Sequence, residues 1–372
     1  AAAVAPPVLG SLMIVALYLL AKKLFGTKVA LLSAFLLAID SKHIARTIFG
    51  LPDHDPLELL FFLGALLLLA YALTERNRWP KYAVPAGVLI AATAYTWLGT
   101  PAYMAALLVY GALQIALDLK EGRSSEETIL PLAAAFGVAL LLLLPFWDEP
   151  WLKPSFFGAV GSMAALAFFF VLSRLFFIKN LPWQAFLPTV AASSYIAFIL
   201  SYTIGVGGEI RSLFRSGIGY FGGGDLARVG IEEAMPIFSV YNIFSLPGLG
   251  LLFALAGLVI LIFTIQQSGF RRDQMLFLVW ALFSTAMMVS QARFLFLFSI
   301  SGAILVCLLF FWVGERVRSS VRLEKVDSEA REAGIGIFLL ILLLPAAASI
   351  PGIAEYRPAI SGDWHETLIW LK

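Results

Sequence analysis

Long apolar segments recur along the whole chain, and they constrain its fold more than any other feature. Each segment has roughly 15–21 residues, which is enough for a helix to cross, or nearly cross, the hydrocarbon core of a membrane. Twelve such segments lie near residues 4–20, 27–40, 57–73, 82–97, 101–117, 128–146, 155–172, 184–204, 247–265, 275–291, 294–313 and 335–351. We therefore predict an all-α polytopic membrane protein with about twelve helices.

The composition supports this fold class and excludes a soluble domain. Hydrophobic residues make up 60% of the 372 residues and charged residues only 13%, and the mean hydropathy is +0.90. A soluble domain of this length carries far less apolar surface. The single cysteine, Cys307, lies inside an apolar segment, so neither a disulfide framework nor a thiolate metal site is expected. Membrane lipids are expected partners, and nucleic acid is not.

The loops between the segments alternate in charge, which predicts the orientation of the chain in the membrane. One set of loops carries 17 of the 26 basic residues: Lys22, Lys23, Lys28, Arg76, Arg78, Lys81, Lys120, Arg123, Arg174, Lys179, Arg271, Arg272, Arg316, Arg318, Arg322, Lys325 and Arg331. The positive-inside rule assigns these loops to the cytoplasm. The loops at 46–58, 147–151 and 205–246 are then external, and so is the C-terminus. We therefore expect a transmembrane domain over residues 1–351 and an external linker over 352–372.

The loop at residues 46–58 is unusually rich in charge for this chain. Asp53 and Asp55 are two positions apart, so both carboxylates can point the same way from an extended or turning backbone. Hard oxygen ligands of this kind suit Mg²⁺ or Mn²⁺. Acidic pairs in loops are also common without a metal, and His54 between the two aspartates has an alternative interpretation, in which it only faces outward.

The predicted external loop at 205–246 is the longest stretch between apolar segments. A loop of this length is usually a functional lid or a disordered tether. It contains glycines, but neither nucleotide-binding glycine pattern is present. Glu232 and Glu233, near its far end, are able to meet Asp53 and Asp55, although a carboxylate in a loop is usually only solvated.

Arg293 lies at the junction of two apolar segments, on the same predicted side as the acidic loop. An arginine in this position is either a buried structural partner or an anion ligand that faces a cavity. A phosphate on a lipid carrier is a natural partner for a guanidinium group at this level of the membrane.

Three stretches together resemble a known family. Residues 44–55, Ile-Ala-Arg-Thr-Ile-Phe-Gly-Leu-Pro-Asp-His-Asp, resemble the second acidic motif in the catalytic subunit of oligosaccharyltransferases, most closely the archaeal form. Residues 230–233, Gly-Ile-Glu-Glu, stand where that family has a Thr-Ile-x-Glu motif, and Arg293 with Phe294 is similar to its lipid-phosphate arginine. The resemblance runs over the whole chain in order.

The resemblance implies a GT-C glycosyltransferase fold and a metal-dependent reaction. An oligosaccharide is transferred from a polyprenyl or dolichyl phosphate carrier to asparagine in Asn-x-Ser/Thr sequons, on the external face of the cell membrane. Asp53, Asp55 and Glu233 are then catalytic residues and ligands of Mn²⁺ or Mg²⁺. Arg293 binds the lipid phosphate. Gly230, Ile231 and Glu232 belong to the loop that meets the acceptor polypeptide.

The sequence also departs from the family pattern. Gly230 replaces the leading threonine of its motif, and the adjacent Glu232 leaves the register uncertain by one residue. The family's first helix, its first external loop with a further acidic ligand, and its Trp-Trp-Asp-Tyr-Gly sequon-reading motif are absent from this sequence. We therefore expect a fragment that keeps much of the lipid-donor site but is inactive alone.

Three alternatives remain open at the level of sequence. Another GT-C enzyme that uses a polyprenyl-phosphate sugar would also carry an external acidic motif, but not the long loop that ends in Ile-x-Glu. A secondary transporter would place its charges at mid-membrane in broken helices, whereas these charges cluster at the external edge. A non-catalytic scaffold would tolerate replacement of Asp53, Asp55 and Arg293.

Overall fold

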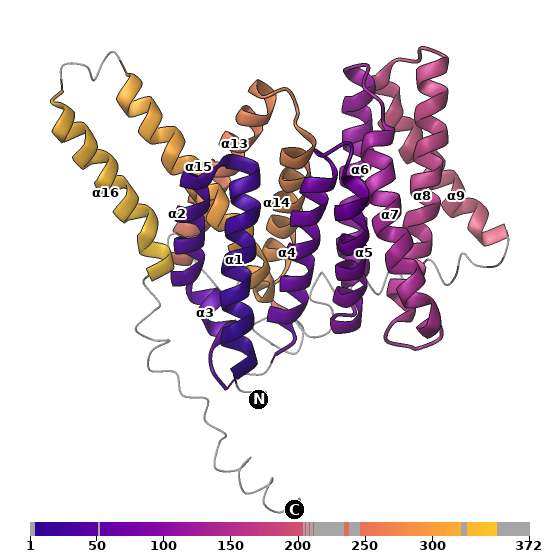
Figure 1. Ribbon diagram of the computed structural model, residues 1–372, viewed down its shortest axis with the longest axis horizontal. Coiled ribbons are helices and arrows are strands. Elements are labelled where there is room, and N and C mark those ends of the chain that lie inside the picture. The colour runs from indigo at the N-terminus through magenta and orange to yellow at the C-terminus, as the bar shows by residue number, and fades with distance from the viewer. Residues whose placement is uncertain are drawn as a thin grey trace, which may run out of the picture.

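The computed structural model describes residues 4–50, 53–203, 205, 208, 211, 234–237, 246–320 and 326–347. The described part of the chain is helical, without strands (Figure 1). Its helices are α1 (Ala5–Phe25), α2 (Thr27–Ile39), α3 (Ser41–Thr47), α4 (Asp55–Ala72), α5 (Trp79–Thr96), α6 (Thr100–Lys120), α7 (Glu126–Leu143), α8 (Lys153–Ile178), α9 (Phe186–Thr203), α13 (Leu246–Gln267), α14 (Arg272–Ser290), α15 (Leu295–Ser319) and α16 (Ser328–Ala347). The expected linker at 352–372 lies outside the described residues.

Each of the twelve expected apolar segments coincides with one of these helices, so the predicted all-α membrane fold is confirmed. Ten helices among the described residues are long and apolar enough to cross a membrane. The helix α2 has only 13 residues and is too short for that criterion, and α5 is not among the ten. The fold is therefore that of a multi-pass membrane protein.

The short helix α3 is the element that the apolar pattern does not predict. The segment expected at 27–40 ends one residue early, because Asp40 caps α3 instead of continuing α2. The Oδ1 atom of Asp40 accepts hydrogen bonds from the backbone N–H groups of Lys42 and His43, each at 2.9 Å. This is the usual N-cap arrangement, which satisfies donors that have no partner inside the helix. With seven residues and several polar side chains, α3 leaves no hydropathy signal.

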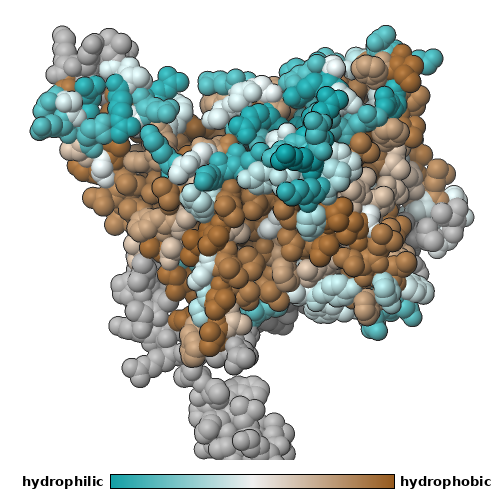
Figure 2. Space-filling model, in the orientation of Figure 1, coloured by the Kyte–Doolittle hydropathy of each residue, from teal (hydrophilic) through white to brown (hydrophobic). Residues whose placement is uncertain are grey.

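The helices stand side by side in a bundle that is wider than it is deep (Figure 1). The helix α4 packs against α1 and α5, and α14 packs against α6, α4 and α15. The helices α5 to α9 extend the bundle on one side, and α16 lies at the opposite edge. On the face seen in Figure 2, a hydrophobic band crosses the middle of the bundle, and hydrophilic residues gather above and below it. This distribution is the one that a bilayer imposes on a helical protein.

The directions of the helices place the polar loops at two ends of the bundle. The helix α4 begins at Asp55 and, after 18 residues, ends at Ala72, which separates the two ends by about 27 Å. Phe296, at the start of α15, stacks on His43 of α3, with ring centroids 5.9 Å apart. The acidic loop and the Arg293 junction therefore share one end. Arg272, at the start of α14, lies at the other end, where it pairs with Asp118 of α6. Which end faces the cytoplasm stays a prediction.

Candidate functional site

The candidate site is a cluster of charged side chains where the chain enters α4. One ligand atom from each of Asp53, His54 and Asp55 lies within 4.8 Å of the others, and these three residues are called the acidic cluster below. His54 is the N-cap of α4, Asp55 is its first residue, and a proline occupies the first turn. Acidic side chains are favourable here because the helix N-terminus carries partial positive charge, and proline costs no hydrogen bond. The sequence therefore orders the cluster locally.

Arg46 joins the acidic cluster from α3. Its Nη1 atom lies 3.0 Å from Oδ2 of Asp53 and 3.5 Å from Oδ2 of Asp55. The three side chains are about three-quarters buried. The sequence placed Arg46 in the same charged loop, but α3 is what turns its guanidinium back onto both carboxylates. The carboxylates are thereby held on one side of the loop, as a shared cation requires.

His54 lies between the two aspartates and contacts both. Its Nδ1 atom is 2.9 Å from Oδ1 of Asp53, and its Nε2 atom is 3.5 Å from Oδ1 of Asp55. The hydrogen bond from His54 lowers the pKa of Asp53, and Arg46 lowers it further. The hydrogen bond to Asp53 raises the pKa of His54, and the charges of both aspartates add to this effect. The alternative in which His54 only faces outward is wrong, although half of its side chain is exposed.

Glu58 lies one turn further along α4, and sequence reasoning gave it no separate role. Only 7% of the residue is exposed. Its Oε1 atom accepts a hydrogen bond from the hydroxyl group of Tyr103 in α6 at 3.3 Å. Its Oε2 atom is buried without a hydrogen-bond partner and lies 4.0 Å from Nε2 of His54. The sequence signal that could have identified Glu58 is its spacing from Asp55, because residues three positions apart share one face of a helix.

Arg293 lies in the short turn Ala292–Phe294 between α14 and α15 and is partly buried. The backbone N–H of Ala292 donates a hydrogen bond to the carbonyl oxygen of Met235 at 2.9 Å. The turn therefore contacts the chain just after residue 233. It lies at the same end of the bundle as the acidic cluster, because Phe296, which follows it, stacks on His43 of α3. Gly230, Ile231, Glu232 and Glu233 lie outside the described residues.

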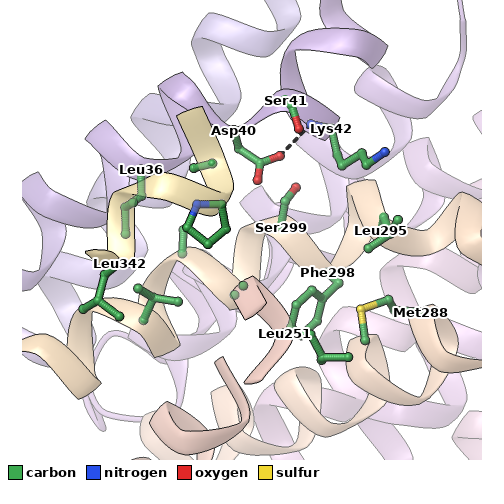
Figure 3. A pocket seen from close by; sticks show the side chains of 16 residues that line it. Leu36, Asp40, Ser41, Lys42, Leu251, Met288, Leu295, Phe298, Ser299 and Leu342 are labelled. Atoms are coloured by element: carbon green, nitrogen blue, oxygen red, sulfur yellow. Dashed lines mark hydrogen bonds between the residues drawn. The ribbon is translucent and has the colours of Figure 1, made fainter. Parts of the chain in front are cut away.

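A small cavity lies at the start of α3, where residues of α2, α13, α14, α15 and α16 meet (Figure 3). Its volume is about 100 Å³. Asp40, Ser41, Lys42 and Ser299 contribute its polar lining, and the rest of its wall is apolar or glycine. None of the expected site residues lines it. The cavity is therefore separate from the acidic cluster, and the sequence did not predict it.

A known protein family shares this architecture, a helical membrane bundle with a charged end. The chain matches the family model described as "Oligosaccharyl transferase STT3, N-terminal" over residues 1–350. The fold thus defines a membrane protein of the GT-C type, in agreement with the expectation. The chain belongs to the STT3 oligosaccharyl transferase family.

Two curated relatives illustrate the similarity. The dolichyl-phosphooligosaccharide-protein glycotransferase 1 of Archaeoglobus fulgidus is 27% identical over 390 residues, which cover 99% of this chain and 58% of that protein. The dolichyl-monophosphooligosaccharide–protein glycotransferase AglB of Haloferax volcanii is 25% identical over 264 residues, which cover 63% of this chain and 25% of that protein. The chain thus spans little more than half the length of the first relative.

Two solved structures share the fold. Archaeal oligosaccharyltransferase AglB from Archaeoglobus fulgidus, in complex with an inhibitory peptide and a dolichol-phosphate, matches with a TM-score of 0.82 and 21% identity. That match covers 99% of this chain and 46% of the solved one. A complex of the A. fulgidus oligosaccharyltransferase with Zn and sulfate matches with a TM-score of 0.73 and 19% identity, over 99% of this chain and 43% of the solved one.

Proposed function

We propose that this chain carries the lipid-donor side of an oligosaccharyltransferase. In the whole protein, an oligosaccharide passes from a dolichyl or other polyprenyl phosphate carrier to asparagine in an Asn-x-Ser/Thr sequon. The observation that carries the proposal is the acidic cluster, which shares one end of the bundle with Arg293. Membership of the STT3 family supports it, and so do the names of the relatives. The family match also favours this activity over the transporter and scaffold alternatives.

The acidic cluster has the donor set of a divalent cation site. Asp53 and Asp55 offer hard carboxylate oxygens, which suit Mn²⁺ or Mg²⁺, and His54 offers a ring nitrogen within the same 4.8 Å group. Glu233 is the proposed ligand from the external loop. A bound divalent cation supplies charge neutralisation for a departing phosphate group.

Each side chain then has a distinct task. Arg46 holds the two aspartates on one side of the loop through contacts of 3.0 and 3.5 Å. Arg293 binds the phosphate of the lipid carrier, because a guanidinium group matches phosphate oxygens in geometry and charge. Glu233 holds the acceptor carboxamide, whose nitrogen attacks the anomeric carbon with inversion. Catalysis of this kind rests on positioning and on charge stabilisation without a covalent intermediate.

The chain after Glu233 supports its proposed placement. Ala234 and Ile237 are buried, and Met235 accepts the hydrogen bond from Ala292 beside Arg293. Since Glu233 directly precedes Ala234 in the sequence, one short stretch connects it to the Arg293 turn. We place the acceptor and the reaction on the external face of the cell membrane, on the strength of the charge distribution in the loops.

The test is glycan transfer by the full-length protein in detergent micelles, with a dolichyl-linked oligosaccharide and a peptide containing Asn-x-Thr. We expect Asp53→Ala, Asp55→Ala and Glu233→Gln each to lower transfer by about 10²–10³-fold, the range found when one electrostatic catalytic group is removed. If Glu232→Gln is damaging and Glu233→Gln is not, the register of the motif shifts by one residue. Undiminished transfer by an Asp53→Ala, Asp55→Ala double variant would contradict the proposal. Transfer by residues 1–372 alone would contradict the expectation that these residues are inactive by themselves.

A different acceptor defines the second candidate function, that of another GT-C enzyme using a polyprenyl-phosphate sugar. The same acidic cluster and Arg293 would serve its donor. Release of the glycan to a lipid or a sugar, with none transferred to the peptide, would favour this alternative.

A further inference from the structure

Glu58 is a buried carboxylate that the proposed reaction does not yet use. It lies three positions after Asp55 on α4, so the two side chains share one face of the helix. One of its oxygens, Oε2, has no hydrogen-bond donor and faces Nε2 of His54 at 4.0 Å. Nε2 of His54 is also 3.5 Å from Oδ1 of Asp55. Asp55 and Glu58 therefore converge on the same ring nitrogen.

The surroundings of Glu58 keep its side chain in this position. Tyr103, which donates to Oε1, is itself held by aromatic neighbours. Its ring lies 4.3 Å from that of Phe62 and 4.7 Å from that of Trp97, centroid to centroid. Phe62 is one turn below Glu58 on α4 and also packs against Trp280 at 4.9 Å. Aromatic rings thus lie beneath the carboxylate, and its Oε2 atom lies on the side of His54.

A carboxylate oxygen that is buried without a donor is costly, so such groups are usually paired with a cation or another ligand. Among the described residues, the cationic group nearest to Oε2 is the imidazole of His54, beyond hydrogen-bonding distance. Ring nitrogens of metal-binding histidines are typically oriented by a carboxylate or carbonyl behind them, and removing such a partner lowers metal affinity. Glu58 occupies that position behind His54.

We propose that Glu58 is a positioning residue of the acidic cluster. It adds a third carboxylate charge behind His54 and thereby sets how tightly the cluster holds a divalent cation. The inference rests on the metal site of the proposed function and deepens it. Because Glu58 is buried, its fixed charge acts more strongly than it would at an exposed surface. Glu58 contributes through its charge and through the orientation of His54, without contact with the donor or the acceptor.

The test is Mn²⁺ binding to the purified full-length protein, followed by the electron paramagnetic resonance signal of free Mn²⁺ without lipid or peptide present. The variant Glu58→Gln keeps the size of the side chain and an oxygen that accepts from Tyr103, and it removes only the charge. We expect its Mn²⁺ dissociation constant to rise about 10–100-fold, the range for partners behind a metal ligand. Glycan transfer by this variant should recover when Mn²⁺ is raised in proportion.

A matched control is Glu126→Gln, which makes the same substitution in a carboxylate at the opposite end of the bundle, where its pair with Arg174 is partly exposed. Its Mn²⁺ affinity should stay within about twofold of the wild type. Unchanged affinity in Glu58→Gln, or an equal loss in both variants, would overturn the inference. Binding that depends on Glu58 in a protein that transfers no glycan would support the inference and reject the proposed function. A wild type that binds no Mn²⁺ would overturn the inference together with the metal site.

Discussion

Two groups of charged residues lie at opposite ends of the bundle, and they differ in their balance of charge. At one end, Asp53, Asp55 and Glu58 face a single guanidinium group and a single imidazole among the described contacts, those of Arg46 and His54. At the other end is what we call the ion-pair network, in which acidic and basic side chains are equal in number. Its members are Asp118, Glu121, Glu127, Asp273, Arg76, Arg123, Arg271 and Arg272.

The ion-pair network is centred on Asp118, whose side chain is completely buried. Its Oδ1 atom lies 3.2 Å from Nη2 of Arg272 and 3.4 Å from Nη2 of Arg123. Thr128 donates a hydrogen bond to Oδ2 at 2.8 Å, and Gln114 donates one to Oδ1 at 3.0 Å. Every oxygen of this buried carboxylate is thus satisfied within the protein. Since Asp118 is in α6, Thr128 in α7 and Arg272 in α14, the network fastens three helix ends together.

The difference indicates which group serves structure and which serves a ligand. A balanced network whose buried carboxylate is fully hydrogen-bonded has no unmet requirement for a cation, so its natural role is to hold the helices in register. Counted over the described residues, the acidic cluster with Arg46 and Glu58 has more negative than positive groups, and one buried oxygen of Glu58 has no donor. An arrangement of that kind becomes favourable when a cation is added. In the sequence, both groups are visible as charged residues in an apolar chain. Only the way in which their charges are paired in the structure distinguishes the two groups.

The largest effect that would test this contrast is loss of stability when Asp118 is changed to Asn. Removal of one partner of a buried ion pair typically costs about 3–5 kcal/mol, and the completely buried Asp118 is a partner that Arg272 and Arg123 share. Thermal unfolding in detergent, read by circular dichroism, measures the change. The control is Glu126→Ala, which breaks a pair with Arg174 whose side chains are more than one-third exposed and should cost at most about 1 kcal/mol. An equal loss of stability in the two variants would contradict a structural role for the ion-pair network.

A smaller effect is expected for Arg293→Ala, at the end that we assign to ligands. Loss of a hydrogen bond to a charged group costs about 1.5–3 kcal/mol, so the KM for the lipid-linked donor should rise about 10–100-fold. The KM for the acceptor peptide should change little, because the guanidinium group is proposed to contact the donor alone. Initial rates with each substrate varied separately measure both constants. A rise confined to the peptide KM would reassign Arg293 to the acceptor.

The smallest effect concerns the pH dependence of the acidic cluster in the presence of a chelator. The pKa of His54 is raised in the folded protein by its hydrogen bond to Asp53. The contribution of protonated His54 to stability is therefore complete below its unfolded pKa of about 6.5 and is lost as the pH rises through the higher folded pKa. The pKa of Asp53 is lowered, so its own contribution is present above about 3.8 and is lost as the pH falls through the folded value.

The measurement is the Tm difference between the wild type and His54→Gln across pH 5–9. We expect the wild type to be more stable at pH 5 by less than about 1 kcal/mol, because half of the His54 side chain is in solvent. The difference should shrink as the pH rises above about 6.5. A difference that is constant over this range would show that the His54 contact with Asp53 involves no change of protonation.

The sequence by itself determined the membrane class, the twelve apolar helices and the acidic loop, because apolar length and local clusters of charge are properties of neighbouring residues. It also carried the family resemblance, through the stretches at 44–55, 230–233 and 293–294. Glu233 and its neighbours stay predictions, since they lie outside the described residues.

Only the tertiary structure decided how the charges are paired. Glu58 and Tyr103 are 45 positions apart in the chain, and Asp118 and Arg272 are 154 positions apart. Helix packing brings each pair together, and it leaves no periodic signal along the chain. The turn of Arg46 onto both aspartates likewise depends on α3, a helix too short and too polar to be seen in the hydropathy pattern. Charge in an apolar chain can be located from the sequence, but whether that charge is already satisfied depends on which helices meet.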